Sequence, residues 1–156
     1  MARSSSTMQL TRAADYGIRV MIHLATLPAH ERALLPALAR ATGAPQSFLS
    51  KVLQALCRAG FIASRRGQAG GFEILPPGRK VSVRSVIEAI EGPICLNLCL
   101  LSGASCKRKS FCPAHPVWAS AQEAMLGVLN TATIADLALQ SATPQLRALR
   151  ARSKPA

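Results

Sequence analysis

The apolar residues of the first sixty positions recur at helical spacing in three separate runs. Between Thr11 and Leu27 they follow three- and four-residue steps, which predicts a helix. Leu35–Thr42 predicts a short second helix with a proline near its start. A third helix is expected after a tight turn at Gly43 and runs to about Ala59. Two short helices joined by a tight glycine-containing turn are typical of a helix-turn-helix.

The third of these helices has two chemically different faces. A core-facing stripe at i, i+3, i+4 and i+7 consists of Leu49, Val52, Leu53 and Leu56. The opposite face carries short polar or basic side chains and no acid, namely Ser47, Ser50, Lys51, Gln54 and Arg58. Hydrogen-bonding groups without negative charge suit a helix that lies in the major groove of DNA. A solvated surface face is the alternative interpretation.

A β-hairpin is expected directly after the third helix. Phe61–Ser64 and Phe72–Leu75 are short strand-like runs, and the turn between them is rich in glycine. Arg65 and Arg66 stand at the base of this turn. A hairpin that follows a helix-turn-helix is a wing, and arginines at its tip can enter the narrow minor groove. An ordinary hairpin loop is the alternative.

The second half of the chain predicts three more helices and a different role. Residues 82–91 form one amphipathic helix, and 134–139 a short closing helix. The helix expected between them, Val117–Asn130, has a wide stripe of small apolar residues that suits packing against another helix, including that of a second copy. The predicted fold is mainly α with a small β-hairpin wing: a winged helix-turn-helix plus a long dimerisation helix. Three regions follow: a DNA-binding region (8–80), a loop and dimerisation helix (81–140) and a basic flexible tail (141–156).

The distribution of charge agrees with this division. The chain of 156 residues has a net charge of +12, of which +8 lies in residues 1–80, zero in 81–140 and +4 in 141–156. A positive charge concentrated on the helix-turn-helix half indicates double-stranded DNA as the partner. The chain contains no apolar run of membrane-spanning length and no signal core at its start, so we expect a cytoplasmic protein without a membrane partner.

Four cysteines and a histidine lie within 21 residues of the second half: Cys95, Cys99, Cys106, Cys112 and His115. Their spacings are wider than the close pairs of most structural zinc sites. Iron–sulfur clusters are held by thiolates and sometimes histidine, and disulfides are disfavoured inside cells. An iron–sulfur cluster, zinc and free thiols all remain open from spacing alone. A thiol enzyme with His115 as base is a further alternative, but it leaves the basic half unexplained, so we expect no enzyme.

The order of these features resembles the IscR/NsrR family of iron–sulfur winged-helix regulators. The segments that carry the resemblance are MQLTRAADYGIR, the helix-turn-helix, RRGQAGGF and a three-cysteine loop before a long helix, so that it covers roughly Met8–Leu139. The resemblance implies a homodimeric transcriptional regulator that binds a pseudo-palindromic operator. From the polar face and the wing we predict DNA contacts at Ser47, Ser50, Lys51, Gln54, Arg65 and Arg66. The resemblance also implies a repressor that responds to nitric oxide, redox state or iron–sulfur status.

The same resemblance implies three cluster ligands, Cys99, Cys106 and Cys112. The fourth ligand is a histidine three residues after the last cysteine in IscR-like members, which is His115 here. In NsrR-like members it is an aspartate of the other subunit's first helix, which corresponds to Asp15. This sequence has both, and the gap between Cys99 and Cys106 is one residue longer than the commonest pattern. The cluster type, [2Fe–2S] or [4Fe–4S], therefore stays open, as do the zinc-stabilised and thiol-redox alternatives.

Overall fold

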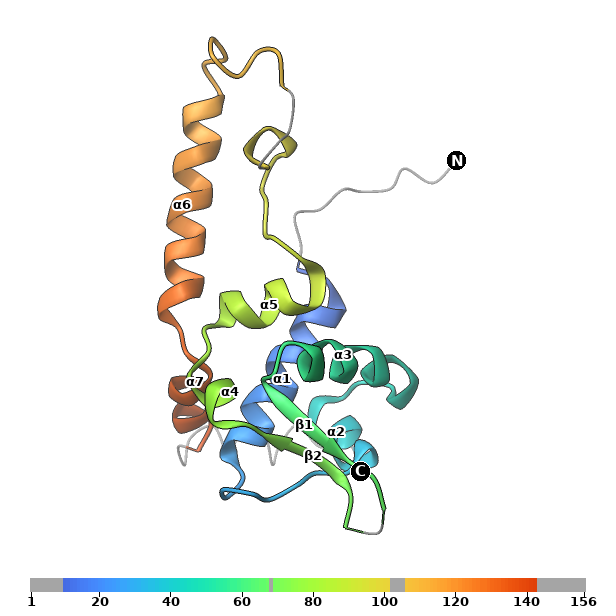
Figure 1. The fold of residues 1–156 in the computed structure, drawn as a ribbon. Coiled ribbons are helices and arrows are strands. Elements are labelled where there is room, and N and C mark those ends of the chain that lie inside the picture. The colour runs from blue at the N-terminus through green and yellow to red at the C-terminus, as the bar shows by residue number, and fades with distance from the viewer. Residues whose placement is uncertain (1–9, 68, 102–105, 143–156) are drawn as a thin grey trace.

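The computed structural model describes residues 10–67, 69–101 and 106–142 (Figure 1). Helix α1 (Arg12–Thr26) begins at Thr11, whose side chain accepts hydrogen bonds from two backbone amides of the first turn. Helices α2 (Leu35–Thr42) and α3 (Gln46–Arg58) follow. They are joined by a turn in which Gly43 has a φ of +70°, a conformation that favours glycine. The predicted helix-turn-helix is therefore confirmed, with α1 packed against both of its helices.

Two antiparallel strands form the wing, β1 (Ile62–Arg65) and β2 (Gly71–Ile74). Their register pairs Ile62 with Ile74 and Arg65 with Gly71, so β1 begins one residue later and β2 one residue earlier than expected. The connection between α1 and α2 adds a bridge between Ala33 and Phe72, which the sequence pattern did not predict. The wing is thus supported along one edge by a segment about forty residues away in sequence.

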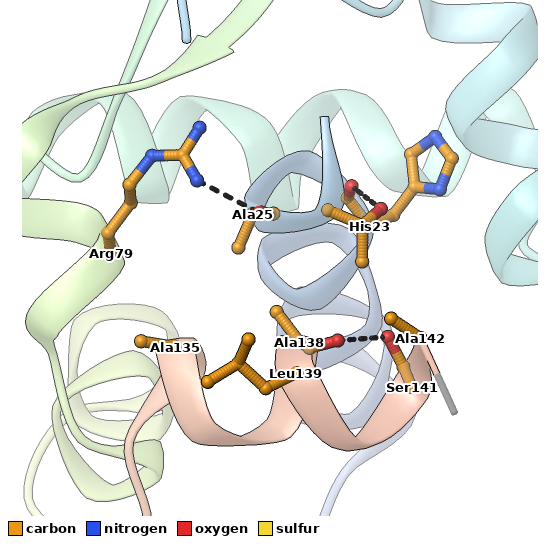
Figure 2. A pocket seen from close by; sticks show the side chains of 9 residues that line it. His23, Ala25, Arg79, Ala135, Ala138, Leu139, Ser141 and Ala142 are labelled. Atoms are coloured by element: carbon orange, nitrogen blue, oxygen red, sulfur yellow. Dashed lines mark hydrogen bonds between the residues drawn. The ribbon is translucent and has the colours of Figure 1, made fainter. Parts of the chain in front are cut away.

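A short helix that the sequence pattern did not predict, α4 (Pro76–Lys80), follows the wing. Its Arg79 donates hydrogen bonds to the carbonyl oxygens of Ala25 (2.9 Å) and Leu27 (3.0 Å) at the end of α1, as Figure 2 shows for Ala25. A cation at this position satisfies helix-end carbonyl groups that lack intrahelical partners. The next helix, α5 (Val83–Glu91), begins at Ser82, which accepts a hydrogen bond from the Ser85 amide.

The described part of the second half contains a 3₁₀ turn (η1, Leu98–Leu100) and helices α6 (His115–Thr131) and α7 (Ile134–Ser141). Figure 1 shows α6 as one long helix that extends away from the wing, with the cysteine-rich loop at its far end. No residue of α6 is buried within this chain. Helices α1 to α5 and the wing form one packed unit, which we call the head. Helix α7 returns to the head and packs on α1 through the fully buried Ile134. None of the helices in the described residues is long and apolar enough to cross a membrane.

The core lies between α1, the helix-turn-helix and the wing. All four residues of the predicted core stripe of α3, Leu49, Val52, Leu53 and Leu56, are buried there. Burying the stripe leaves the polar face of α3 outside, because the two faces are on opposite sides of one helix. The fold class is therefore confirmed as a mainly helical winged helix-turn-helix.

Candidate nucleic-acid interface and cysteine loop

The polar face of α3 lies on the surface, as the sequence predicts. Ser47, Lys51 and Gln54 are exposed, and Ser50 is half-buried with its hydroxyl donating to the Gln46 carbonyl at 3.2 Å. Lys51 and Gln54 are long enough to reach beyond the helix surface, and this face carries no acidic residue. The face can therefore approach a phosphate backbone and donate hydrogen bonds to base edges.

The wing and α3 meet in an open hollow of about 590 Å³. Ser50 and Gln54 line it from α3, and Arg66 lines it from the turn of the hairpin. Both Arg65 and Arg66 are exposed. The fold thus brings three of the six residues predicted to contact DNA to one surface, although they come from two different elements.

Phe48 is a surface residue that was not among the predicted DNA contacts. Its side chain is 40% exposed at the start of α3, and its ring meets the ring of Tyr16 edge-to-face at a centroid distance of 5.6 Å. The Arg19 guanidinium lies 5.9 Å from the centre of the Tyr16 ring. The helical phase is the signal that could have found Phe48, because this residue falls outside the buried stripe at 49, 52, 53 and 56.

Cys57 is set apart from the other cysteines and lines the hollow between α3 and the wing. Burial raises the pKa of its thiol, and a hydrogen bond with Ser64 lowers the pKa by a smaller amount. The side chain of Cys57 is half-buried, although its neighbours Leu53 and Leu56 on α3 are fully buried. The protonated form dominates near neutral pH, which makes Cys57 a weak nucleophile.

The cysteine loop connects α5 with α6 and is held to α6 by one side chain. Gln122 accepts a hydrogen bond from the Leu96 amide at 3.0 Å. Cys95 donates to the Asn97 carbonyl, and Cys99 lies within η1. Further along, Cys112 is followed by a turn in which the His115 amide donates to its carbonyl at 3.2 Å. Part of the loop, residues 102–105, lies outside the described residues.

The predicted cluster ligands are present in one loop but are not gathered around a common point. Cys106 is exposed, Cys99 and Cys112 are half-buried, and all three are free thiols. Within the described residues, no three His, Cys, Asp or Glu side chains lie close enough to hold a metal ion. His115 is the first residue of α6, and its Nδ1 atom is buried without a hydrogen-bond partner. That nitrogen therefore makes no hydrogen bond to the first turn of the helix or to any other described group.

Asp15 has a different environment from the cysteine loop. It lies in the first turn of α1, where a carboxylate is favoured by the helix dipole, and it forms an ion pair with Arg19 at 2.8 Å. Arg19 also donates to the Thr42 carbonyl at the end of α2, at 3.1 Å. In Figure 1 the beginning of α1 lies beside α5, whereas residues 106–114 lie at the far end of α6. Within one chain, the structure does not bring Asp15 to the cysteines.

A second hollow of about 560 Å³ lies between the end of α1, α4 and α7 (Figure 2). Small side chains such as Ala135 and Ala138 and the guanidinium of Arg79 line it. None of the residues predicted to bind DNA or a cofactor belongs to it. The two hollows are therefore distinct, and only the one between α3 and the wing coincides with the predicted functional surface.

Comparison with known proteins agrees with this arrangement. The model of the Rrf2 family, described as an iron-dependent transcriptional regulator, matches residues 10–140. The protein rrf2 of Nitratidesulfovibrio vulgaris is 29% identical over 130 residues, which cover 83% of this chain and 87% of that protein. The oxidized form of Staphylococcus aureus CymR matches with a TM-score of 0.67 and 26% identity over 84% of this chain and 96% of that one. IscR of T. potens has a similar fold, with a TM-score of 0.63 and 22% identity over 96% of this chain and 93% of that one.

Proposed function

The chain belongs to the Rrf2 family of transcriptional regulators, and from this premise we propose that it is a homodimeric repressor whose operator affinity depends on an iron–sulfur cluster. The family confirms the resemblance inferred from residues 8–139, and it makes the chain a DNA-binding regulator. Its relatives are regulators and not enzymes, which supports the non-enzymatic interpretation of Cys112 and His115. Acting on DNA, it would work in the cytoplasm.

For DNA, we propose that α3 reads the major groove and the wing reads the minor groove. Ser47, Ser50, Lys51 and Gln54 supply hydrogen bonds to base edges, and Arg65 and Arg66 supply positive charge at the tip of the wing. The exposed, acid-free surface of α3 next to the hollow supports this assignment. Phe48 adds an apolar group at the start of α3 that suits contact with a thymine methyl group.

A second copy of the chain is the proposed occupant of the apolar face of α6. Val117 and Val128 are 64% and 69% exposed, and Trp118 is 38% exposed. Helix α6 contacts α5, but none of its seventeen residues is buried within the chain, so intrachain packing leaves most of its apolar side chains exposed. Pairing of two α6 helices would bury these side chains and hold two reading heads together, as a pseudo-palindromic operator requires.

The donor types of the cysteine loop fit an iron–sulfur cluster, which would be held by Cys99, Cys106 and Cys112. We assign the fourth position to His115, because its buried Nδ1 atom has no other partner. Asp15 of the partner subunit is the competing ligand, but in each chain this carboxylate is already paired with Arg19. When bound, the cluster would supply a redox-active centre that reacts with nitric oxide or oxygen.

The loop is well situated to link such a centre to the reading head. It begins directly after α5, which packs on both α1 and α3, and it ends at α6. The hydrogen bond from the Leu96 amide to Gln122 joins the first part of the loop to the middle of α6. Drawing the cysteines together would change the path between α5 and α6 and so the spacing of the two heads. A coupling of about 1–3 kcal/mol is enough for regulation.

The observation that carries this proposal is the joint presence of an acid-free reading face and a separate thiol–imidazole loop in one chain. The test is operator binding by wild-type protein prepared without oxygen, compared with Cys99→Ala, Cys106→Ala and Cys112→Ala. We expect each variant to lose the visible absorbance of the cluster and the change in DNA affinity on exposure to nitric oxide. Variants that keep the wild-type spectrum and response would contradict the cluster assignment.

A thiol-redox or zinc-stabilised regulator without a cluster is the second candidate. The thiol-redox form is favoured by the exposed Cys106 thiol, which an oxidant can reach. One of the similar solved structures, that of Staphylococcus aureus CymR, is an oxidized form of that protein. Oxidant treatment of the iron-free protein distinguishes the candidates, because only the thiol-redox regulator would then change its operator affinity.

A further inference from the structure

The connection between α1 and α2 runs alongside the wing and forms part of it. Ala33 and Phe72 exchange two backbone hydrogen bonds, from each amide to the other carbonyl, at 3.0 and 2.9 Å. Gly71 has a φ of +127°, and a Cβ atom there would lie 2.9 Å from the Ala33 carbonyl oxygen. The close approach of the two backbones therefore depends on glycine at this position.

Arg32, next to this bridge, contacts the wing at two further points. Its Nε atom donates to a carboxylate oxygen of Glu73 at 3.2 Å, and its Nη1 atom donates to the Ala69 carbonyl at 2.7 Å. The two side chains of the ion pair are only 25% and 12% exposed, the least of the ion pairs among the described residues. The Ala69 carbonyl belongs to the tip turn, which the Gly70 amide closes by donating to Gly67 at 2.9 Å.

We propose that Arg32 is a positioning residue for DNA reading, because it fixes the tip of the wing that carries Arg66. A two-stranded hairpin is marginally stable by itself, so a wing tip that must enter a groove needs support from outside. The planar guanidinium provides it by contacting one side chain of β2 and one backbone carbonyl of the tip at the same time. It also neutralises the carboxylate of Glu73, which is only 12% exposed.

This inference rests on the proposed role of the wing, and hydrogen exchange tests it independently of DNA. In Arg32→Gln, we expect peptides covering residues 64–72 to exchange about tenfold faster than in the wild type, whereas peptides of α3 stay unchanged. Arg84→Gln is the matched control, since it removes the same charge and an ion pair with Glu88 away from the wing. Wild-type exchange rates at the wing tip of Arg32→Gln would overturn the proposal.

Operator binding then tests the functional consequence, using a duplex selected from a random pool by the wild-type protein. We expect Arg32→Gln to bind about tenfold more weakly than the wild type and Arg32→Lys to bind with intermediate affinity. The double variant Arg32→Gln, Arg66→Ala should bind only slightly more weakly than Arg66→Ala alone. Fully additive effects of the two substitutions would show that Arg32 acts separately from Arg66 and would overturn the proposal. A normal affinity of Arg66→Ala alone would instead contradict the proposed role of the wing.

Discussion

Substitution of Arg66 by alanine separates DNA recognition from folding more cleanly than any other change at the interface. The side chain is exposed, and it takes part in none of the ion pairs within the described residues. Its removal should therefore leave the thermal unfolding temperature unchanged. An arginine that reads the groove contributes about 1–3 kcal/mol to binding. Two symmetric heads double this to about 2–6 kcal/mol, which corresponds to a loss of affinity between about 30-fold and 10⁴-fold.

The assay is a titration of the selected duplex with wild type, Arg66→Ala and the Arg84→Gln control, repeated at several salt concentrations. Each lost phosphate contact should reduce the slope of log affinity against log salt by about 0.9, and hence by about 1.8 for the dimer. The control should retain both the affinity and the slope to within about twofold, because Arg84 lies on α5 and pairs with Glu88. Wild-type affinity and slope for Arg66→Ala would refute the minor-groove assignment.

Three further predictions follow from the geometry. Arg79→Gln should destabilise the protein by about 2–4 kcal/mol, since two carbonyl groups at the end of α1 lose a charged donor; thermal unfolding should shift down by about 4–16 °C, and a shift below about 1 °C would be contradictory. In iron-free protein, Cys57 should react with iodoacetamide more slowly than the exposed Cys106 at neutral pH, because burial raises the pKa of Cys57; the stability linked to this protonated thiol is present at neutral pH and is lost as the pH rises through the folded-state pKa. His115→Ala should release iron from protein prepared without oxygen while Asp15→Ala retains it, and the reverse pattern of iron contents would assign the fourth ligand to Asp15 of the partner subunit.

The helices of the head could be predicted from sequence because each has a local signal. Apolar spacing, a capping threonine and a left-handed glycine fix the ends of α1 and α2. The bounds of α2, Leu35–Thr42, agree at both ends. The division of α3 into a buried and a polar face follows from its helical period alone, which is why the candidate DNA-contacting residues could be named from the amino-acid sequence.

Other features could not be predicted because they depend on contacts between distant segments. The bridge between Ala33 and Phe72 and the ion pair between Arg32 and Glu73 join residues about forty positions apart. The sequence analysis did not predict helix α4, since Pro-Pro-Gly is typical of a turn. In the structure this segment is helical, and its Gly78 lies directly against the Phe61 carbonyl, a contact between two separate segments.

The two regions of the sequence that differ in net charge are in contact in the fold, because α5 and α7 of the neutral region pack on α1. Residues 1–80, with a net charge of +8, contain the helix-turn-helix and the wing, and residues 81–140, with a net charge of zero, contain the cysteine loop and helix α6. The C-terminal residues 143–156, which hold the remaining +4, lie outside the described residues. The residues proposed to contact DNA and those proposed to hold the cluster lie in different parts of the chain, and α5 connects the two parts by packing on α1 and α3.

The central claim, that an iron–sulfur cluster controls DNA binding, is tested most directly by one combined measurement. Full-length protein purified without oxygen is analysed for iron, acid-labile sulfide and zinc, and its operator affinity is measured before and after exposure to nitric oxide. We expect iron and sulfide in equal amounts, visible absorbance, and an operator affinity that falls when the absorbance is lost. Zinc or no metal, together with an operator affinity that nitric oxide leaves unchanged, would contradict it.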